Sequence, residues 1–475
     1  KNKAIMTAIC FYFQIHQPFR LKNYRFFDIG NDHYYYDDFA NDDIITRIAH
    51  RSYIPANEML LDIIKANGKK FKVAFSISGT ALEQLEQYVP EFIDSMKELA
   101  ATGCVEFLSE TYAPSLSALE DVEEFVAQVK AHDEKIYQLF GQKPKVFRNT
   151  ELIYSDDIAA MVASMGFKGA ITDGAKHILG WKSPNYLYNA ASAPKLKLLL
   201  KNSKLSDDIS FRFSNSDWAS YPLTADKYIN WIASLPQEEQ LVNLFMNYET
   251  FGELQPQQSG IFEFMKALPR FAAEHDVQFW SPSEVISKLK SVSELSVPSP
   301  ISWADEARDT SAWLGNMLQQ EAVKKLYSIG ERVRLCQDKR IKQDWNYLQA
   351  SDHFFYMSTK HSSDGNVHSH YSPYDSPYTA FTNYMNVLSD FMIRVEAQYP
   401  ADIDNEELNA LLLTIKNQEK EIQALHREVE LMRNNIVKDL TGDFKVETAP
   451  APKKVETSYA KSDFVPGDEI IFDDD

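Results

Sequence analysis

The chain has 475 residues, of which 44% are hydrophobic and 13% aromatic, and its formal net charge is −19 at pH 7. One compact core rarely serves so long a chain, so we expect two or more domains. The negative charge argues against nucleic acid and anionic membranes as partners, because both need a cationic protein face.

The cysteines Cys10, Cys104 and Cys336 form an odd and sparse set without a CxxC spacing. This pattern predicts neither a disulfide framework nor a zinc site, and we expect no cofactor. No window reaches the ~18 apolar residues of a membrane helix, and no signal peptide is recognisable at the start of the sequence. A cytoplasmic location is the expectation that follows.

Apolar runs typical of buried strands alternate with helical patterns through the first 290 residues. The strand candidates are residues 8–15, 71–77, 104–108, 145–147, 169–172 and 241–246. The helical patterns between them cover residues 53–67, 90–102, 122–140 and 155–165. Alternating strands and helices indicate an α/β protein with a parallel sheet, whose strands are buried on both faces. We therefore predict a parallel β/α barrel over residues 6–290.

The composition changes after residue 290. Residues 291–302 are rich in Ser and Pro and predict a linker. Helical patterns at residues 309–349 and 377–399 predict a second, mainly helical domain over residues 291–400. The polar and aromatic stretch at residues 361–376 predicts an ordered loop.

A heptad pattern predicts a coiled coil over residues 405–440. Two interleaved series recur every seven residues: Leu408, Ile415, Ile422, Val429 and Ile436, and Leu411, Gln418, Leu425 and Met432. β-branched residues in the first series and Leu or Met in the second favour a parallel two-stranded coil. A homodimer through residues 408–436 is one interpretation, and a helix packed back on its own domain is the other. Residues 441–475 predict a disordered acidic tail.

Polar residues follow several of the predicted strands: His16, Glu110, Glu151, Asn247 and Glu249. In a β/α barrel the loops at the carboxyl ends of the strands meet, so these side chains are expected around one site. Two carboxylates facing each other across a pocket carry out glycoside hydrolysis. Each Glu can instead be a structural ion-pair partner, and the His can be structural or sugar-binding. No HxxxH or HExxH spacing occurs, so no metal site is predicted.

Five short stretches, in order, resemble the marker regions of glycoside hydrolase family 57. They are residues 16–18 (HQP), 103–112 (GCVEFLSETY), 147–154 (FRNTELIY), 246–253 (MNYETFGE) and 303–316 (WADEARDTSAWLGN). The fifth resembles the α-amylase branch, and the likeness covers residues 6–395. The tripeptide alone is a weak signal, whereas five regions in order are a specific one.

The resemblance implies an α/β fold with an incomplete (β/α)7-type parallel barrel followed by a helical bundle. It also implies retaining cleavage of α-glucans without a metal. Glu151 matches the family's nucleophile, and Asn247 stands at the position of its acid/base Asp. An α-1,4-glucan or maltooligosaccharide would then contact the remaining matched residues: His16, Gln17, Glu110, Tyr112, Glu249, Phe251, Trp303, Asp305 and Trp313.

Two departures from the family's pattern bear on activity. Asn247 replaces the acid/base Asp, and Ala113-Pro114 stands where this branch has a His shortly after the Glu-Thr-Tyr. An amide cannot exchange the proton, and losing general acid catalysis costs about 10²–10⁴ in rate. Glu249, two residues further along an extended strand, would lie about 7 Å away and is not expected to replace the lost acid.

Several functions stay open at this point. One is an impaired α-amylase-type hydrolase, and a second is a non-catalytic α-glucan-binding protein on the same fold. A third is a 4-α-glucanotransferase. A metal-dependent polysaccharide deacetylase would need a clustered Asp/His/His triad, which the spacing does not supply.

Overall fold

The computed structural model describes residues 7–360 and 372–399, together with separate helical positions between 410 and 432. The chain divides into two units, Lys1–Asp402 and Ile403–Asp475, and the fold below is that of the first. The predictions for residues 361–371, for the tail at 441–475 and for much of the heptad segment lie outside the described residues.

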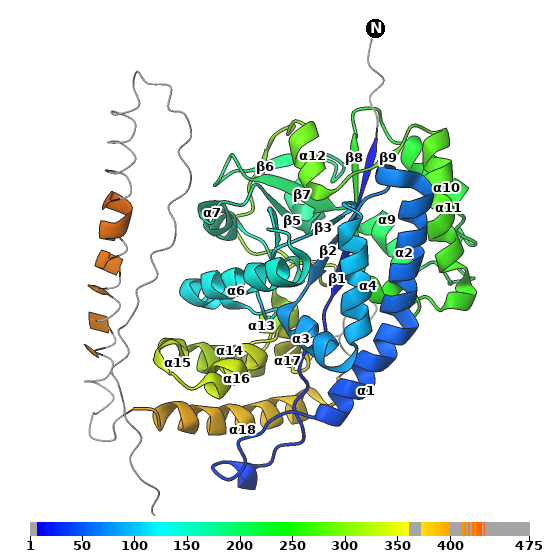
Figure 1. The fold of residues 1–475 in the computed structure, drawn as a ribbon. Coiled ribbons are helices and arrows are strands. Elements are labelled where there is room, and N and C mark those ends of the chain that lie inside the picture. Colours follow the sequence, from blue (N-terminus) through cyan, green and yellow to red (C-terminus); the bar gives the residue numbers. More distant parts are fainter. Residues whose placement is uncertain are drawn as a thin grey trace, which may run out of the picture. The chain divides into compact units, whose positions relative to one another are not determined.

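Seven parallel strands within residues 7–360 follow one another around a barrel. Figure 1 shows the labelled strands side by side, with helices on both sides of them. In ring order they are β1 (Ala8–Ile15), β2 (Val73–Ile77), β3 (Val105–Phe107), β4 (Val146–Arg148), β5 (Gly169–Asp173), β7 (Lys197–Lys201) and β8 (Leu241–Asn247). Regular parallel pairing runs from β8 through β1 and β2 to β3, and separately from β4 through β5 to β7. A single bridge between Ser109 and Phe147 links β3 to β4, and Lys201 pairs with Asn243 to link β7 to β8. The ring therefore closes, and its pairing is sparsest at these two seams.

The strand β1 shows why an apolar sequence suits this position. Its odd-numbered residues from Ile9 to Ile15 point into the cluster that packs against the surrounding helices. Its even-numbered residues Ala8, Cys10 and Tyr12 point into the barrel interior. Successive side chains of a strand alternate between its faces, so both sets must be apolar when both faces are buried.

Helices cover the outside of the barrel. They are α1 (Asp38–Ile48), α2 (Ile54–Asn67), α3 (Gly79–Tyr88), α4 (Pro90–Ala101), α5 (Ser117–Glu120), α6 (Val122–Phe140), α7 (Asp156–Ser164), α8 (Lys176–Leu179), α9 (Ser203–Ser210), α10 (Ala225–Ala233), α11 (Ile261–Glu274) and α12 (Pro282–Lys288). Short strands β6 (Tyr188–Ala190), β9 (Gln278–Phe279) and β10 (Glu294–Leu295) extend the sheet.

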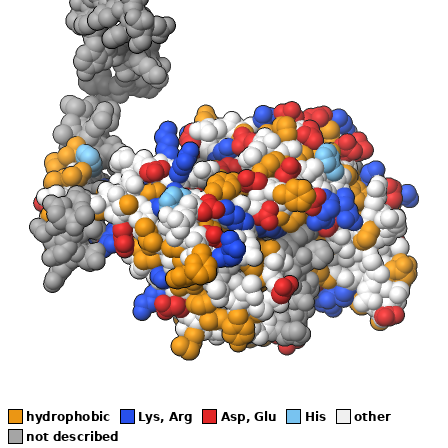
Figure 2. Space-filling view, turned by 90° about the horizontal axis from the view of Figure 1, so that it is seen from below, with side chains coloured by type: hydrophobic (Ala, Val, Ile, Leu, Met, Phe, Trp, Pro, Cys, Tyr) orange, Lys and Arg blue, Asp and Glu red, His pale blue; other side chains and the backbone are white. Residues whose placement is uncertain are grey.

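The remaining helices lie toward the carboxyl ends of the barrel strands (Figure 1). They are α13 (Ser311–Leu314), α14 (Met317–Tyr327), α15 (Gly330–Leu335), α16 (Lys339–Leu348), α17 (Ser351–Phe355) and α18 (Pro377–Glu396). Figure 2 looks at the molecule from this side and shows charged side chains of both signs mixed with hydrophobic ones. Helices α13–α18 belong to the same unit as the barrel.

The α/β class, the mostly parallel sheet and the helices expected from the sequence are confirmed. The linker predicted at residues 291–302 is wrong, because this segment packs on the barrel. It contains β10, which pairs with β6, and its Val297 and Ile301 are buried. Ile301 also exchanges backbone hydrogen bonds with Tyr154. No helix of the described residues is long and apolar enough to cross a membrane.

Candidate active site

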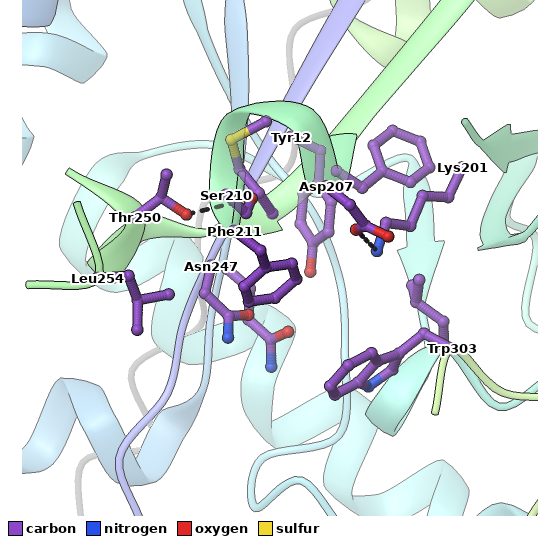
Figure 3. A pocket seen from close by; sticks show the side chains of 13 residues that line it. Tyr12, Lys201, Asp207, Ser210, Phe211, Asn247, Thr250, Leu254 and Trp303 are labelled. Carbon is purple, nitrogen blue, oxygen red and sulfur yellow. Dashed lines mark hydrogen bonds and ion pairs between the residues drawn. The ribbon is translucent and has the colours of Figure 1, made fainter. Parts of the chain in front are cut away.

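A cleft at the carboxyl ends of the strands consists of two adjoining hollows that share Gln14, Asn247 and Trp303. One hollow, the carboxylate half, is also lined by His16, Gln17, Pro18, Arg20, Glu151, Glu249, Asp352 and Tyr356. The other, the aromatic half, is lined by residues that include Tyr12, Lys201, Asp207, Phe211 and Leu254 (Figure 3).

Glu151 lies in a short 3-10 turn directly after β4. Its backbone is left-handed, with φ 53° and ψ 26°, and the next residue, Leu152, has φ 52°. Such a conformation costs a non-glycine residue about 1–2 kcal/mol, so the surrounding structure must hold it. The side chain is almost fully buried, and it accepts hydrogen bonds from Trp303 Nε1 at 2.6 Å and from Ser351 Oγ at 3.2 Å. The turn thus holds one carboxylate at the edge of the cleft.

Ser351 connects Glu151 to the altered second marker region. The backbone N–H of Ser351 donates to the carbonyl oxygen of Pro114 at 2.7 Å, and Ser115 pairs with Ala350 in an antiparallel bridge. The Ala113-Pro114 departure therefore lies in the segment that supports a hydrogen-bond donor of Glu151.

Asn247 is the last residue of β8, and its strand partner is Gln14 on β1. Its side chain lines both halves of the cleft and lies beside Phe211 in Figure 3. The Oε1 atom of Gln14 accepts a hydrogen bond from Arg148 at 2.6 Å, and the same guanidinium forms a buried ion pair with Glu110 at 3.2 Å. A fixed network below the cleft thus orients the neighbour of Asn247.

Glu249 lines the carboxylate half, although it does not lie on an extended continuation of β8. The strand ends at Asn247, and residues Tyr248–Thr250 form a 3-10 turn, so the spacing of about 7 Å along a strand does not apply. Its Oε1 accepts hydrogen bonds from Tyr53 Oη at 2.5 Å and Gln17 Nε2 at 3.3 Å. Burial raises the pKa of this carboxyl, and the two donors oppose the shift.

His16 follows β1 and joins the barrel to α17. Its Nε2 lies 2.7 Å from Asp352 Oδ2, and its Nδ1 lies 2.8 Å from Ser78 Oγ. The neighbouring Gln17 accepts a hydrogen bond from Arg20 at 2.8 Å. Both ring nitrogens of His16 are therefore engaged, which fixes the ring at the wall of the carboxylate half.

The other predicted substrate contacts are distributed differently. Trp303 lines both halves of the cleft, and Lys201 lies 5.8 Å from the centre of its ring. Asp305 is buried with a backbone φ of 55° and lies 3.2 Å from Lys360, and it lines neither half.

Four further predicted residues lie away from the cleft surface: Glu110, Tyr112, Phe251 and Trp313. Glu110 is fully buried and accepts a hydrogen bond from Ser76 at 2.5 Å besides its pairing with Arg148. The hydroxyl of Tyr112 donates to Glu83. Phe251 and Trp313 are fully buried in two hydrophobic clusters. Their positions are those of supporting residues, because none of the four lines the cleft.

The sequence did not single out several residues that line the cleft, among them Gln14, Lys201, Asp207, Asp352 and Tyr356. Lys201 lies 3.5 Å from Asp207 across the aromatic half. The available signal was the short apolar run at 198–200 within β7, the strand that ends at Lys201. Within the described ranges, no group of three or more His, Cys, Asp and Glu side chains could hold a metal ion.

The arrangement gives the cleft one well-held carboxylate, one central amide and one buried carboxyl with a raised pKa. A carboxylate held by two donors can stabilise positive charge or attack an electrophilic carbon. An amide can donate and accept hydrogen bonds but cannot transfer a proton. Aromatic rings and polar groups in one cleft suit a sugar, which presents apolar ring faces and hydroxyls.

Comparisons with known proteins agree with this geometry. The model of Glycosyl hydrolase family 57 matches residues 10–298, more than half of the chain. A Methanocaldococcus jannaschii protein named "Putative alpha-amylase" is 42% identical over 397 residues, which is 81% of this chain and 84% of the relative.

Two solved structures share the fold at low sequence identity. A family-57 branching enzyme from Thermococcus kodakaraensis superimposes with a TM-score of 0.59 at 12% identity, covering 85% of this chain and 94% of that chain. The 4-alpha-glucanotransferase from Thermococcus litoralis gives 0.55 at 17% identity, covering 74% and 56%. The family match, the relative at 42% identity and the shared fold all agree on the same family. The chain therefore belongs to glycosyl hydrolase family 57 and resembles the α-amylases within it.

Proposed function

We propose that the cleft binds α-1,4-glucans of the starch and glycogen type and that Glu151 is the nucleophile of a retaining glycosidase site. Asn247 occupies the acid/base position, so the cleavage of ordinary glucans is slow. Binding of the polymer is then the activity that the cleft retains in full.

The observation that carries this proposal is the conformation of Glu151. Left-handed backbone at a non-glycine residue is costly and occurs preferentially at functional sites. Here it places a carboxylate between Trp303 and Ser351 at the wall of a cleft that Asn247 also lines.

The slow turnover follows from the leaving group. Retaining cleavage needs the glycosidic oxygen to be protonated while the nucleophile attacks the anomeric carbon. Asn247 cannot supply this proton, which costs about 10²–10⁴ in rate. Two other carboxyls line the same half, but Glu249 is already held by Tyr53 and Gln17, and Asp352 pairs with His16.

The test compares hydrolysis of maltooligosaccharides and of an aryl maltoside by the chain and its variants. The aryl leaving group needs little protonation, so the chain should cleave it faster than it cleaves maltooligosaccharides. Asn247→Asp should raise maltooligosaccharide cleavage about tenfold or more, and Glu151→Gln should abolish cleavage of both substrates. Asn230→Asp, an exposed position on α10, is the matched control and should change neither rate.

Product analysis separates the remaining functions. Longer maltooligosaccharides formed from maltotriose would identify a 4-α-glucanotransferase, in which a sugar hydroxyl replaces water. Binding without any cleavage, even of the aryl maltoside, would identify a non-catalytic glucan-binding protein. Fast cleavage of maltooligosaccharides that Asn247→Asp leaves unchanged would refute the proposed role of position 247.

A further inference from the structure

Another hollow, apart from the two that form the cleft, lies on the outer side of the barrel between α9 and α10. We call it the indole groove and define it by Leu205, Asp208, Arg212, Trp218, Trp231 and Leu235. It is open to solvent and holds about 1420 Å³ of empty space. It shares no lining residue with the cleft, so it is a separate site.

Two tryptophans form an apolar corner in this groove. The ring centres of Trp218 and Trp231 lie 6.2 Å apart, with their planes at 80°. Both rings are half-buried and pack with one side on the main hydrophobic cluster. The backbone of Trp218 is held in consecutive turns, donating to Asn215 and accepting from Tyr221. The corner is thus fixed before any ligand arrives, which lowers the entropic cost of binding.

Polar groups surround the apolar corner. Arg212 lies over the ring of Trp218 at 5.9 Å and donates to Asp208 at 2.6 Å. Ser220 and Ser234 complete the rim. A concave apolar surface with a few fixed polar groups is the usual form of a small-ligand site. Paired aromatic rings with hydroxyl and charged groups at the edge match a sugar chain, whose ring faces are apolar and whose rim carries hydroxyls.

The helix α9 places this groove next to the cleft. Asp207 and Ser210 of α9 and the following Phe211 line the aromatic half. Lys204 and Asp208 of α9, four residues apart, line the indole groove from another face of the helix, and Arg212 lines it just beyond the end of the helix. A long glucan bound in the cleft therefore has a second aromatic site at another face of the same helix. Linked contacts of this kind raise the overall affinity without strengthening either site.

We propose that the indole groove is a second binding site for α-1,4-glucan chains, in which Trp218 and Trp231 stack on the sugar rings. The identity of this ligand rests on the function proposed above. The groove binds the polymer, and the cleft either cleaves the same chain or binds it independently of the groove.

The experiment measures retardation of the full chain in native gels that contain glycogen, with dextran as the α-1,6-linked control. Trp218→Ala and Trp231→Ala should each weaken retention by glycogen about tenfold or more, as expected for a buried aromatic contact. Ser234→Arg fills the groove from an exposed position, so its effect does not depend on the core packing of the tryptophans. Trp181→Ala removes a 93% exposed tryptophan outside the groove and should leave retention unchanged.

A cleft variant, Trp303→Ala, distinguishes this proposal from the proposed function. Groove variants that bind maltotriose normally but lose retention by glycogen support the groove. If Ser234→Arg and both tryptophan variants are retained like the parent while Trp303→Ala is not, the groove proposal is overturned and the cleft assignment stands. If the groove variants lose retention and Trp303→Ala weakens neither retention nor maltotriose binding, the groove proposal stands and the cleft assignment is overturned. A parent chain that glycogen does not retard overturns both.

Discussion

Trp303 donates a hydrogen bond from its indole Nε1 to Glu151 Oε2 over 2.6 Å, although the two residues are 152 positions apart in the chain. The tryptophan also lines both halves of the cleft. One side chain therefore holds the proposed nucleophile and forms part of the surface on which the sugar would lie.

Trp303→Phe tests this relationship, because it removes the donor and keeps an aromatic ring. A hydrogen bond to a charged group contributes about 1.5–3 kcal/mol, so kcat/KM for an aryl maltoside should fall about 10–100-fold. Trp280→Phe is the matched control, since its Nε1 donates to Gln278 outside the cleft. Equal rates for the two variants would show that the hydrogen bond does not position Glu151.

The buried pair of Arg148 and Glu110 should matter for stability. Their side chains are at most 1% exposed, and Arg148 also holds Gln14 beside Asn247. Arg148→Met leaves the carboxylate buried without its cation, which should lower the free energy of unfolding by about 3–5 kcal/mol. Urea denaturation measures this loss.

A partly exposed ion pair provides the comparison. Arg334 lies 2.7 Å from Asp121 at the surface between the barrel and α15, and its side chain is 24% exposed. Arg334→Met should cost only about 1 kcal/mol, because solvent screens such pairs. Similar losses for both variants would contradict the structural role assigned to Glu110.

The main strands could be predicted from the sequence because a strand that is buried on both faces has a continuous run of apolar residues. Residues 8–15 are apolar on both alternating sets, and they form β1 as expected. The strand β7 was missed because Lys197 and Lys201 flank only three leucines, too short a run to stand out. Their charges are accommodated by carbonyl groups of Ile286 and Leu289 and by Asp207, which no local pattern shows.

Only those residues of the site that lie in the matched sequence motifs could be predicted. The motifs indicated Glu151, Asn247 and His16, all of which line the carboxylate half. They gave no role to Asp352, which pairs with His16 across 336 positions of the chain. Phe251 and Trp313 belong to the matched motifs, yet their side chains pack in the core. A motif indicates which residue types occur together in a short stretch of sequence. Whether their side chains are buried depends on segments that are distant in the sequence.

His353 should make the protein sensitive to acid. Burial lowers the pKa of this histidine from 6.5 to about 4. Between these values the unfolded chain binds a proton that the folded chain does not, so stability is lost as the pH falls below about 6.5. The loss approaches about 1.4 kcal/mol per pH unit, the value for one proton.

His353→Gln removes this titration and keeps a donor for the carbonyl oxygen of Tyr347. The test compares the variant with the parent chain by the slope of the unfolding free energy between pH 7 and about pH 4.5, because a constant loss of packing does not change this slope. We expect a shallower slope than in the parent chain. Parallel slopes would show that His353 is protonated equally in both states.

The heptad segment should join two copies of the chain. Its described seam positions are helical, and Leu411, Ile422, Leu425, Val429 and Met432 are 47–58% exposed. Apolar side chains repeated every seven residues are stabilised when a second helix covers them. We therefore expect a dimer mass by light scattering, which becomes a monomer mass when Leu425→Lys places a charge in the seam. Leu413→Lys is the matched control, because Leu413 is 59% exposed but lies off the seam.

Gln418 supplies the converse test. A polar residue at a seam position lowers the stability of a coil, so Gln418→Leu should shift the monomer–dimer equilibrium toward the dimer. Dilution followed by light scattering would show a lower dissociation concentration than for the parent chain. If the parent, Leu425→Lys and Leu413→Lys all have a monomer mass, the helix does not self-associate. If all three have a dimer mass, the two copies are joined by a different surface.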